Sequence, residues 1–156
     1  KGFTLIEILI VIGIIAILAA IVIIAINPAK QFAQARNTQR ESGINSILNA
    51  IGQRMADNKG VFEGTFDTNK HCDQIPTGPT AISNSMGNSA LGNATGNLGC
   101  LVPTYIPALP TEPLGTGSGI DQYTIELVDG GRVEVCAPES DDESAIPNPV
   151  LLCVTR

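Results

Sequence analysis

The chain has 156 residues, which suits a single domain, and its 15 acidic and 9 basic side chains give a formal net charge of −6. It contains one histidine, four cysteines and no tryptophan. The acidic balance argues against general nucleic-acid binding, and the single histidine leaves little for histidine-based catalysis. We therefore expect neither a nucleic-acid-binding protein nor an enzyme.

The charges are segregated along the chain. Residues 1–60 carry a net charge of +3, whereas residues 61–156 carry three basic and twelve acidic side chains. The sequence therefore predicts a basic stem that precedes an acidic head.

An apolar run occupies the N-terminal part of the stem. Residues 8–26 contain no charged side chain and are interrupted only by Gly13. As a helix this run reaches roughly 28 Å, close to the hydrocarbon thickness of a bilayer. A cleaved secretory signal is the alternative, but its apolar core is usually about 7 to 15 residues long. The run is therefore predicted to be a retained membrane-spanning helix.

Beyond Asn27 and Pro28 the apolar residues recur every three or four positions, which predicts an amphipathic helix. We expect one long helix over residues 4–57, kinked or unwound near residues 24–28, because proline lacks a backbone donor and clashes with the preceding turn. Glycines at 13, 43 and 52 fit either close helix packing or extensibility. The predicted apolar face comprises Phe32, Ala35, Ile44, Ile47, Leu48, Ile51 and Met55, and the predicted polar face includes Arg36, Arg40 and Arg54.

The segment Gly2-Phe3-Thr4-Leu5-Ile6-Glu7, followed directly by the apolar run, resembles the class III signal sequence of type IV pilins. This resemblance implies cleavage between Gly2 and Phe3 by a prepilin peptidase, with N-methylation of Phe3. Glycine suits such a site because it lets an extended backbone enter a tight cleft. The implied domains are a leader remnant (1–2), a membrane and filament-core helix (3–27), an amphipathic helix (28–57) and a head (58–156).

Glu7 is the main candidate for an assembly residue. An ionised carboxylate beside an apolar helix is costly in lipid unless it has a partner. The resemblance implies that this partner is the amine of Phe3 in a neighbouring subunit. A local alternative is a capping box, in which Thr4 and Glu7 satisfy each other's backbone amides.

The head is expected to be a variable loop region over 58–119, a hairpin over 120–136 and a C-terminal loop and strand over 137–156. Residues 76–99 approach low complexity and predict a long surface loop. Asn93 begins a minimal N-glycosylation acceptor, although a plain solvated loop is the favoured interpretation. The alternation around Asp129-Gly130-Gly131 predicts the hairpin, and residues 150–155 predict a third strand. The expected fold is α+β, pilin-like, with the stem helix covering a small antiparallel sheet.

Cysteines occur only in the predicted head, at positions 72, 100, 136 and 153. An even number of distant cysteines in an exported region predicts disulfides. We favour Cys72 with Cys100 and Cys136 with Cys153, because each pair closes a neighbouring loop. A zinc site that includes His71 is the alternative, but no paired C-x-x-C spacing supports it, and no metal or other cofactor is predicted.

The second predicted bridge encloses a loop with four acids, Glu139, Asp141, Asp142 and Glu143. Such a loop resembles the exposed disulfide loop of pilins, which mediates adhesion or contacts between subunits. The favoured interpretation of the acids themselves is a solvated charge cluster.

These features together predict a structural pilin subunit of an extracellular type IV pilus that serves adhesion, twitching motility or DNA uptake. Its expected partners are copies of itself, the prepilin peptidase, an assembly platform with ATPases, and a surface receptor. The membrane holds it before assembly. A pseudopilin of type II secretion and a single-pass membrane-anchored surface protein are the alternatives.

Overall fold

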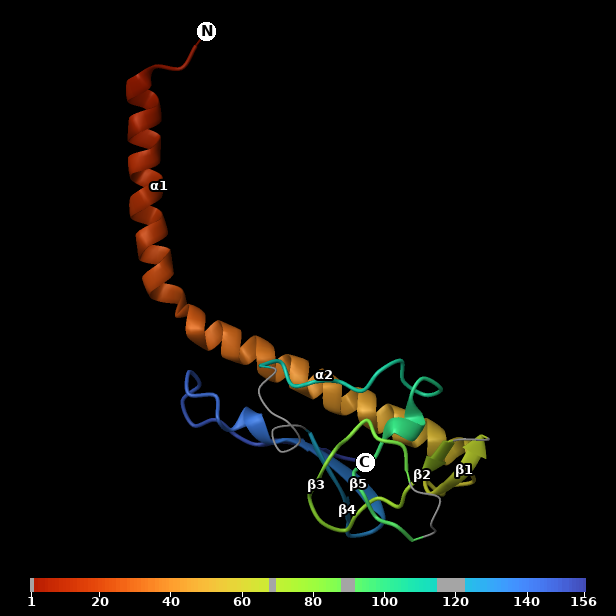
Figure 1. Ribbon diagram of the computed structural model, residues 1–156. Coiled ribbons are helices and arrows are strands. Elements are labelled where there is room, and N and C mark those ends of the chain that lie inside the picture. The colour runs from red at the N-terminus through yellow and green to blue at the C-terminus, as the bar shows by residue number, and fades with distance from the viewer. Residues whose placement is uncertain (1, 68–69, 88–91, 115–122) are drawn as a thin grey trace.

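The computed structural model describes residues 2–67, 70–87, 92–114 and 123–156. A long helical stem projects from a small head of helix and sheet, and the N-terminus lies at the far end of the stem (Figure 1). The chain is an α+β protein with two disulfides, which confirms the predicted fold class.

The stem consists of two helices, α1 (Leu5–Ile26) and α2 (Pro28–Asp57). Between them Asn27 takes a left-handed conformation with φ 46°, ends α1 and caps α2, while Pro28 occupies the first turn of α2, where its missing N–H costs nothing. The two helix axes diverge sharply at this point (Figure 1). The break falls inside the window that Pro28 predicts, so two helices replace the single kinked one.

The described part of the head contains two antiparallel sheets. A two-stranded sheet pairs β1 (Gly64–Asp67) with β2 (Lys70–Cys72). A four-stranded sheet has the order β3-β4-β5-β6, formed by Thr80–Ala81, Thr124–Val128, Arg132–Ala137 and Leu152–Thr155. Short 3-10 turns lie at Gly99–Leu101 and Pro138–Ser140.

The predicted hairpin is present as β4 and β5, with Ile125 paired with Val135. Its turn uses Gly130 and Gly131 at φ 85° and 76°, a conformation that residues with a side chain rarely adopt. Residues 120–122 of the predicted hairpin lie outside the described residues. The third strand begins at Leu152, two residues later than predicted.

The described residues of the stretch 76–99 are mostly irregular, as predicted, but not all of them lie at the surface. This stretch contributes strand β3 and the core side chains of Ile82 and Leu98, which are only 5% and 1% exposed. Residues 88–91 of that loop lie outside the described part of the chain. The sequence did not predict this burial, because the apolar residues of an irregular segment do not recur with the period of a helix or a strand.

The core forms where α2 lies against the four-stranded sheet. Ile44, Ile47 and Ile51 are fully buried, as the periodicity predicts, and they pack with side chains of β4 and β5. The predicted face was wrong at its N-terminal end, because Phe32 is 65% exposed and Ala35 is exposed as well. Ala33 is buried there instead, so the helix is rotated slightly from the predicted stripe.

The three helical glycines differ in their surroundings. A Cβ atom at Gly43 would lie 2.7 Å from the Tyr123 Oη and 3.1 Å from the Pro110 Cβ, so close packing requires a glycine there. A Cβ atom at Gly13 or Gly52 would meet no atom within 4 Å. Of these three helical glycines, Gly43 is therefore the one with a packing role inside the chain.

Candidate processing and assembly site

The predicted cleavage bond lies in an extended segment ahead of the first helix. Gly2, Phe3 and Thr4 precede the helix that begins at Leu5, and Phe3 is 85% exposed. A Cβ atom at Gly2 would meet nothing within 4 Å. The Gly2–Phe3 bond is thus outside regular structure and accessible, as the backbone of a protease substrate must be.

Thr4 and Glu7 form the capping box. The Thr4 backbone N–H and hydroxyl donate to Glu7 Oε2 at 2.9 and 2.7 Å, and the Glu7 N–H donates to Thr4 Oγ1 at 3.4 Å. Both hydrogen bonds to the carboxylate go to Oε2. Among the described residues Glu7 Oε1 has no hydrogen-bond partner, so one carboxylate oxygen is available to a cation from another molecule.

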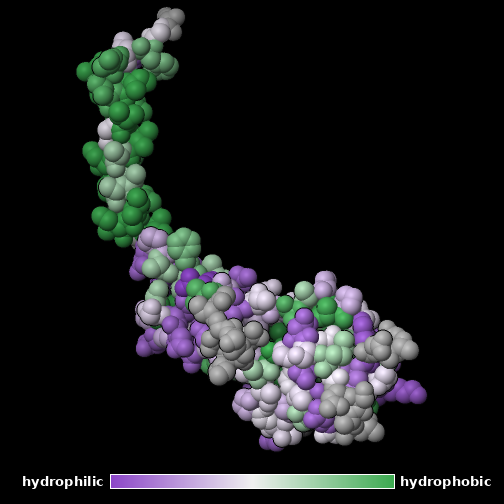
Figure 2. Space-filling model, in the orientation of Figure 1, coloured by the Kyte–Doolittle hydropathy of each residue, from purple (hydrophilic) through white to green (hydrophobic). Residues whose placement is uncertain are grey.

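Helix α1 is apolar on every side. Its segment Leu5–Ile24 has a mean hydropathy of 3.2, is not buried within the chain, and is by length and composition able to cross a membrane. The apolar surface visible in Figure 2 is concentrated along this helix, whereas the head shows mainly polar residues. Helices with apolar side chains all round need lipid or other apolar helices around them.

A second site, which the sequence analysis missed, joins α2 to two loops of the head. Arg40 is 0% exposed and donates to Glu112 Oε1 from Nε at 3.0 Å and also through Nη2. Its Nη1 donates to Glu143 Oε1 at 2.6 Å and to Asn37 Oδ1 at 2.6 Å. Arg36 donates from Nε to Glu143 Oε1 at 2.7 Å and binds Oε2 through Nη2. Two arginines of α2 thus form ion pairs with two glutamates from loops of the head.

The charges in this cluster shift the pKa values of its members. Hydrogen bonds from Arg36, and then from Arg40, lower the pKa of Glu143 to about 2 despite burial. Burial acts to lower the pKa of Arg40, but hydrogen bonds to Glu112 and Glu143 outweigh it and raise that pKa. Burial and the nearby Glu112 raise the pKa of Tyr123 to about 12. Arg40 and Glu143 are therefore both charged at neutral pH.

The burial of these residues differs from what their polarity predicts. Arg40 and Arg54 belong to the predicted polar face of α2, yet they are only 0% and 2% exposed. Glu143 was assigned to a solvated acidic cluster, and it is 4% exposed. A signal was present, because Arg36, Arg40, Ile44, Ile47 and Ile51 continue one stripe at spacings of three and four.

The four cysteines form two disulfides, in the pairing that the sequence favours. Cys72 and Cys100 are 0% exposed with Cα atoms 5.4 Å apart, and they tie β2 to the turn at Gly99–Leu101. Cys136 and Cys153 lie opposite each other on β5 and β6, with Cα atoms 4.1 Å apart. Each bridge closes a loop in a head that has a small core.

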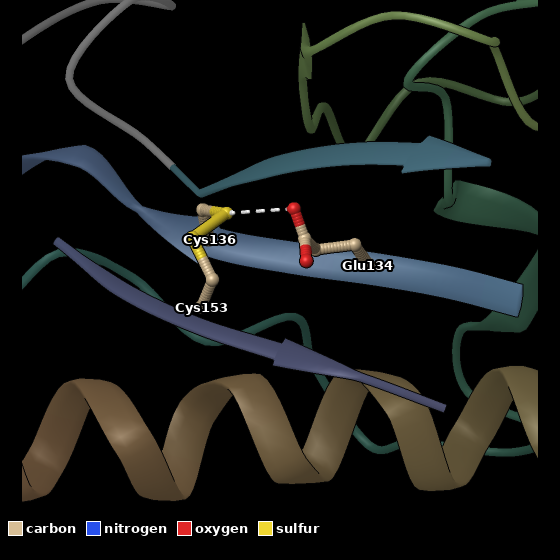
Figure 3. Close-up of side chains that lie close together, drawn as sticks. All are labelled: Glu134, Cys136 and Cys153. Carbon is tan, nitrogen blue, oxygen red and sulfur yellow. Dashed lines mark hydrogen bonds between the residues drawn. A yellow bond between two sulfur atoms is a disulfide. The ribbon is translucent and has the colours of Figure 1, made fainter. Parts of the chain in front are cut away.

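Both bridges remove the thiolates that the zinc alternative needs. Glu134, Cys136 and Cys153 are close enough to suggest a metal site, but the two sulfur atoms are bonded to each other (Figure 3). Glu134 Oε1 lies 3.8 Å from Cys136 Sγ, which has no proton to donate. His71 instead shares a hydrogen bond of 2.9 Å between its Nδ1 and Thr65 Oγ1.

The glycosylation candidate Asn93 belongs to a hydrogen-bonded loop. Asp73, which is 1% exposed, accepts from Asn93 Nδ2 at 3.5 Å, from Thr95 Oγ1 at 2.6 Å and from Asn97 Nδ2 at 3.4 Å. The nitrogen that a glycan would modify thus faces a buried carboxylate. This arrangement favours a structural role for the Asn-Ala-Thr segment.

Comparison with known proteins finds a match for the segment that contains the first of these sites. The family model for the prokaryotic N-terminal methylation motif matches residues 1–25, which include the Gly2–Phe3 bond, the capping box and most of α1. No solved structure matches the chain. The match and the apolar helix together support membrane anchoring of this part of the chain. The chain therefore carries, at residues 1–25, the class III signal peptide of type IV pilins.

Proposed function

We propose that the chain is a structural pilin subunit that polymerises through its N-terminal helix into an extracellular type IV pilus. The observation that carries this proposal is the apolar segment Leu5–Ile24, of which nothing is buried within the chain, directly after a methylation motif. A single copy cannot cover this surface. Lipid covers it in the waiting subunit, and α1 helices of other copies cover it in the polymer.

Processing precedes assembly in this proposal. The prepilin peptidase hydrolyses the Gly2–Phe3 bond, and the amine released on Phe3 becomes N-methylated. The extended and exposed backbone at residues 2–4 supports this step, because a helical peptide bond would first have to unwind to enter a protease cleft. Thr4 stays with the helix and continues to cap it.

Docking of each new subunit then depends on Glu7. The amine of Phe3 in one subunit binds the carboxylate of Glu7 in its neighbour, and the free Oε1 supports this because Thr4 holds only Oε2. An ion pair in an apolar surrounding is strongly favoured over either charge alone, so it sets the register of the bundle. A separate assembly platform and its ATPase drive extension, and the subunit itself has a structural role.

The alternatives are a pseudopilin of type II secretion and a membrane-anchored surface protein. Residues 1–25 are compatible with either of them. Fractionation and electron microscopy separate the three. A pilin appears in filaments sheared from the cell surface, a pseudopilin in short periplasmic assemblies, and an anchored protein in the membrane fraction alone. The intact mass of the sheared protein should correspond to a chain that begins at methylated Phe3. Reduction of the two bridges should add the mass of four hydrogens.

A variant tests the proposed role of Glu7 directly. Glu7→Gln should remain in the membrane fraction, processed at Phe3, while sheared filaments fall at least tenfold. Thr4→Ser, which keeps the capping hydroxyl, is the matched control and should assemble normally. Normal filaments from Glu7→Gln would contradict the docking role.

A further inference from the structure

Two adjoining cavities form a groove between α2 and the β4–β5 hairpin. Their volumes are about 260 and 220 Å³, and they share Met55, Gly131 and Val133. The groove extends from Val61 to Leu48, and most of its side chains are apolar. Val61 at its rim is 54% exposed. This surface could therefore take apolar side chains of another molecule.

Basic side chains flank one end of the groove. Arg132 and Arg156 both line the smaller cavity, and both are exposed. Arg156 donates to Asn49 Oδ1 at 2.5 Å and to Asn45 Oδ1 at 2.8 Å, and Arg132 donates to the Asp129 carbonyl at 3.4 Å. Within the described residues neither arginine pairs with a carboxylate. An occupant with acidic side chains beside apolar ones would complement this end.

Gly52 forms part of the same groove wall. It lies inside the C-terminal half of α2, where glycine costs about 1 kcal/mol relative to alanine. Nothing within 4 Å inside the chain would meet a Cβ atom there, in contrast to Gly43. The open helix surface lets a neighbouring molecule approach the backbone closely.

The chain itself carries a surface of the complementary kind at the other end of the head. Val150 and Leu151 are 70% and 44% exposed. The Ser140 hydroxyl accepts from the Leu152 N–H at 2.7 Å and donates to the Val150 carbonyl at 3.2 Å. The exposed Asp141 and Asp142 come directly after Ser140 in the sequence, so they lie close to Val150 and Leu151. Neither aspartate has a salt-bridge partner among the described residues. We call Asp141, Asp142, Val150 and Leu151 the acidic tip.

We propose that the acidic tip of one copy of this chain docks into the groove beside Gly52 of a second copy. Val150 and Leu151 enter the apolar groove, while Asp141 and Asp142 face Arg132 and Arg156. The apolar contact supplies affinity, and the rim charges set orientation and register. This contact rests on the filament proposed above and assigns the surfaces through which its heads meet.

The two surfaces lie at different positions along α2, which determines the kind of assembly. The loop of the tip is tied to Arg36 and Arg40 through Glu143, whereas the groove contacts residues 48–55. The separation is roughly 20 Å along the helix at 1.5 Å per residue. A contact between two different surfaces is heterologous, and if its rotation does not close into a ring it propagates as a filament.

Zero-length cross-linking tests the contact in assembled filaments. In an Arg132→Lys variant, a carbodiimide should couple the introduced lysine to Asp141 or Asp142, and mass spectrometry of the dimer band should identify the joined peptides. Strand β5 alone separates positions 132 and 137 by roughly 17 Å. The cross-link is read from the dimer band, and its absence from detergent-dispersed subunits would show that it joins two copies.

Further variants assign the result to the proposed surfaces. Adding Asp141→Asn and Asp142→Asn should lower the yield of this cross-link at least tenfold, and adding Gly52→Leu, which fills the groove, at least fivefold. Asp57→Asn removes another exposed acid, at the C-terminal end of α2, and should leave the yield unchanged. Detergent-dispersed subunits should give none of the product.

Each other outcome overturns the contact in a distinguishable way. Intact filaments without this cross-link refute the contact and leave the proposed function standing. Coupling of the introduced lysine to another protein shows that the groove has a different occupant. The absence of any polymer from the cells contradicts the proposed function, and the contact with it.

Discussion

Arg40 Nη1 donates a hydrogen bond of 2.6 Å to Glu143 Oε1, although 103 residues separate the two in the sequence. The same guanidinium holds Glu112, so one side chain of the stem fixes two loops of the head. The apolar core lies further along α2, at Ile44 and beyond. The part of the head nearest α1 is thus attached to the stem through these ion pairs.

Removal of Arg40 should destabilise the head strongly. Arg40→Ala leaves the buried Glu112 without its arginine partner and removes one of the two arginines that bind Glu143. Breaking a buried pair in this way costs about 3 to 5 kcal/mol. Chemical unfolding of the full chain in detergent, followed by circular dichroism, measures the free energy of unfolding. Arg36→Ala is the comparison, because the Arg36 side chain is 27% exposed, and it should cost clearly less. Equal losses for the two variants would contradict the central position of Arg40.

Acid should weaken the same cluster in a defined range of pH. The pKa of Glu143 is lowered to about 2 in the folded chain from an ordinary value of 4.5, so its ionised form stabilises the fold above about pH 4.5. That contribution is lost as the pH falls from about 4.5 to 2. The difference in unfolding free energy between wild type and Glu143→Gln should therefore be largest near pH 6 and shrink towards pH 2. Glu41→Gln on the exposed face of α2 is the control, and a difference independent of pH would refute this assignment.

Two alanine substitutions in α2 should have opposite effects. Gly52→Ala should raise the free energy of unfolding by about 0.5 to 1 kcal/mol, because its Cβ meets nothing and alanine favours the helix. Gly43→Ala should lower it by about 1 to 3 kcal/mol, because its Cβ would press on Tyr123 and Pro110. Tyr123→Phe removes the nearest atom and should restore part of the loss in the double variant. Thermal unfolding of the wild type, the two glycine variants and the double variant measures these changes in stability. Stabilisation by Gly43→Ala would show that the site is not tightly packed.

The two disulfides should differ in accessibility to reductant. Cys72 and Cys100 are 0% exposed, whereas Cys153 is exposed at the edge of the sheet. Under native conditions a small thiol should therefore reduce the Cys136–Cys153 bridge first, as alkylation and peptide mapping would show. Loss of either bridge through a double Cys→Ala variant should cost about 3 kcal/mol, since the bridges close loops of 17 and 28 residues. Prior reduction of Cys72–Cys100 would contradict the buried placement.

The bend between α1 and α2 should depend on Asn27 and Pro28. Changing both to alanine removes the left-handed residue and restores a backbone donor, so the helices should merge. The distance between spin labels at positions 14 and 39 should then increase to roughly 37 Å, the length of 25 residues in a straight helix. Asn27→Gly is the control, since glycine adopts the left-handed conformation readily and should keep the shorter distance. An unchanged distance in the double variant would show that other contacts set the bend.

The sequence predicted the parts of this molecule that local patterns determine. The apolar run gives α1, the residues Pro28 and Asp129-Gly130-Gly131 give the break and the hairpin, and the threonine and glutamate three positions apart give the capping box. It missed Glu112, Glu143 and the core residue Ile82, because their burial depends on segments distant in the chain. A charged side chain is expected at the surface unless a partner is known, and no pattern along the chain names the partner of Arg40.

The break at Asn27 has a mechanical consequence. If α1 stands along the bilayer normal, the sharp divergence of α2 places the head alongside the lipid headgroups instead of at the tip of a straight rod (Figure 1). Lys30 and the exposed Phe32, in the first turns of α2, then lie at the level where lipid meets water. In the assembly proposed above, withdrawal of α1 from the bilayer would therefore swing the head as well as lift it. A pull along the axis of the proposed filament would act on this bend, and the bend can straighten while the contacts between subunits persist.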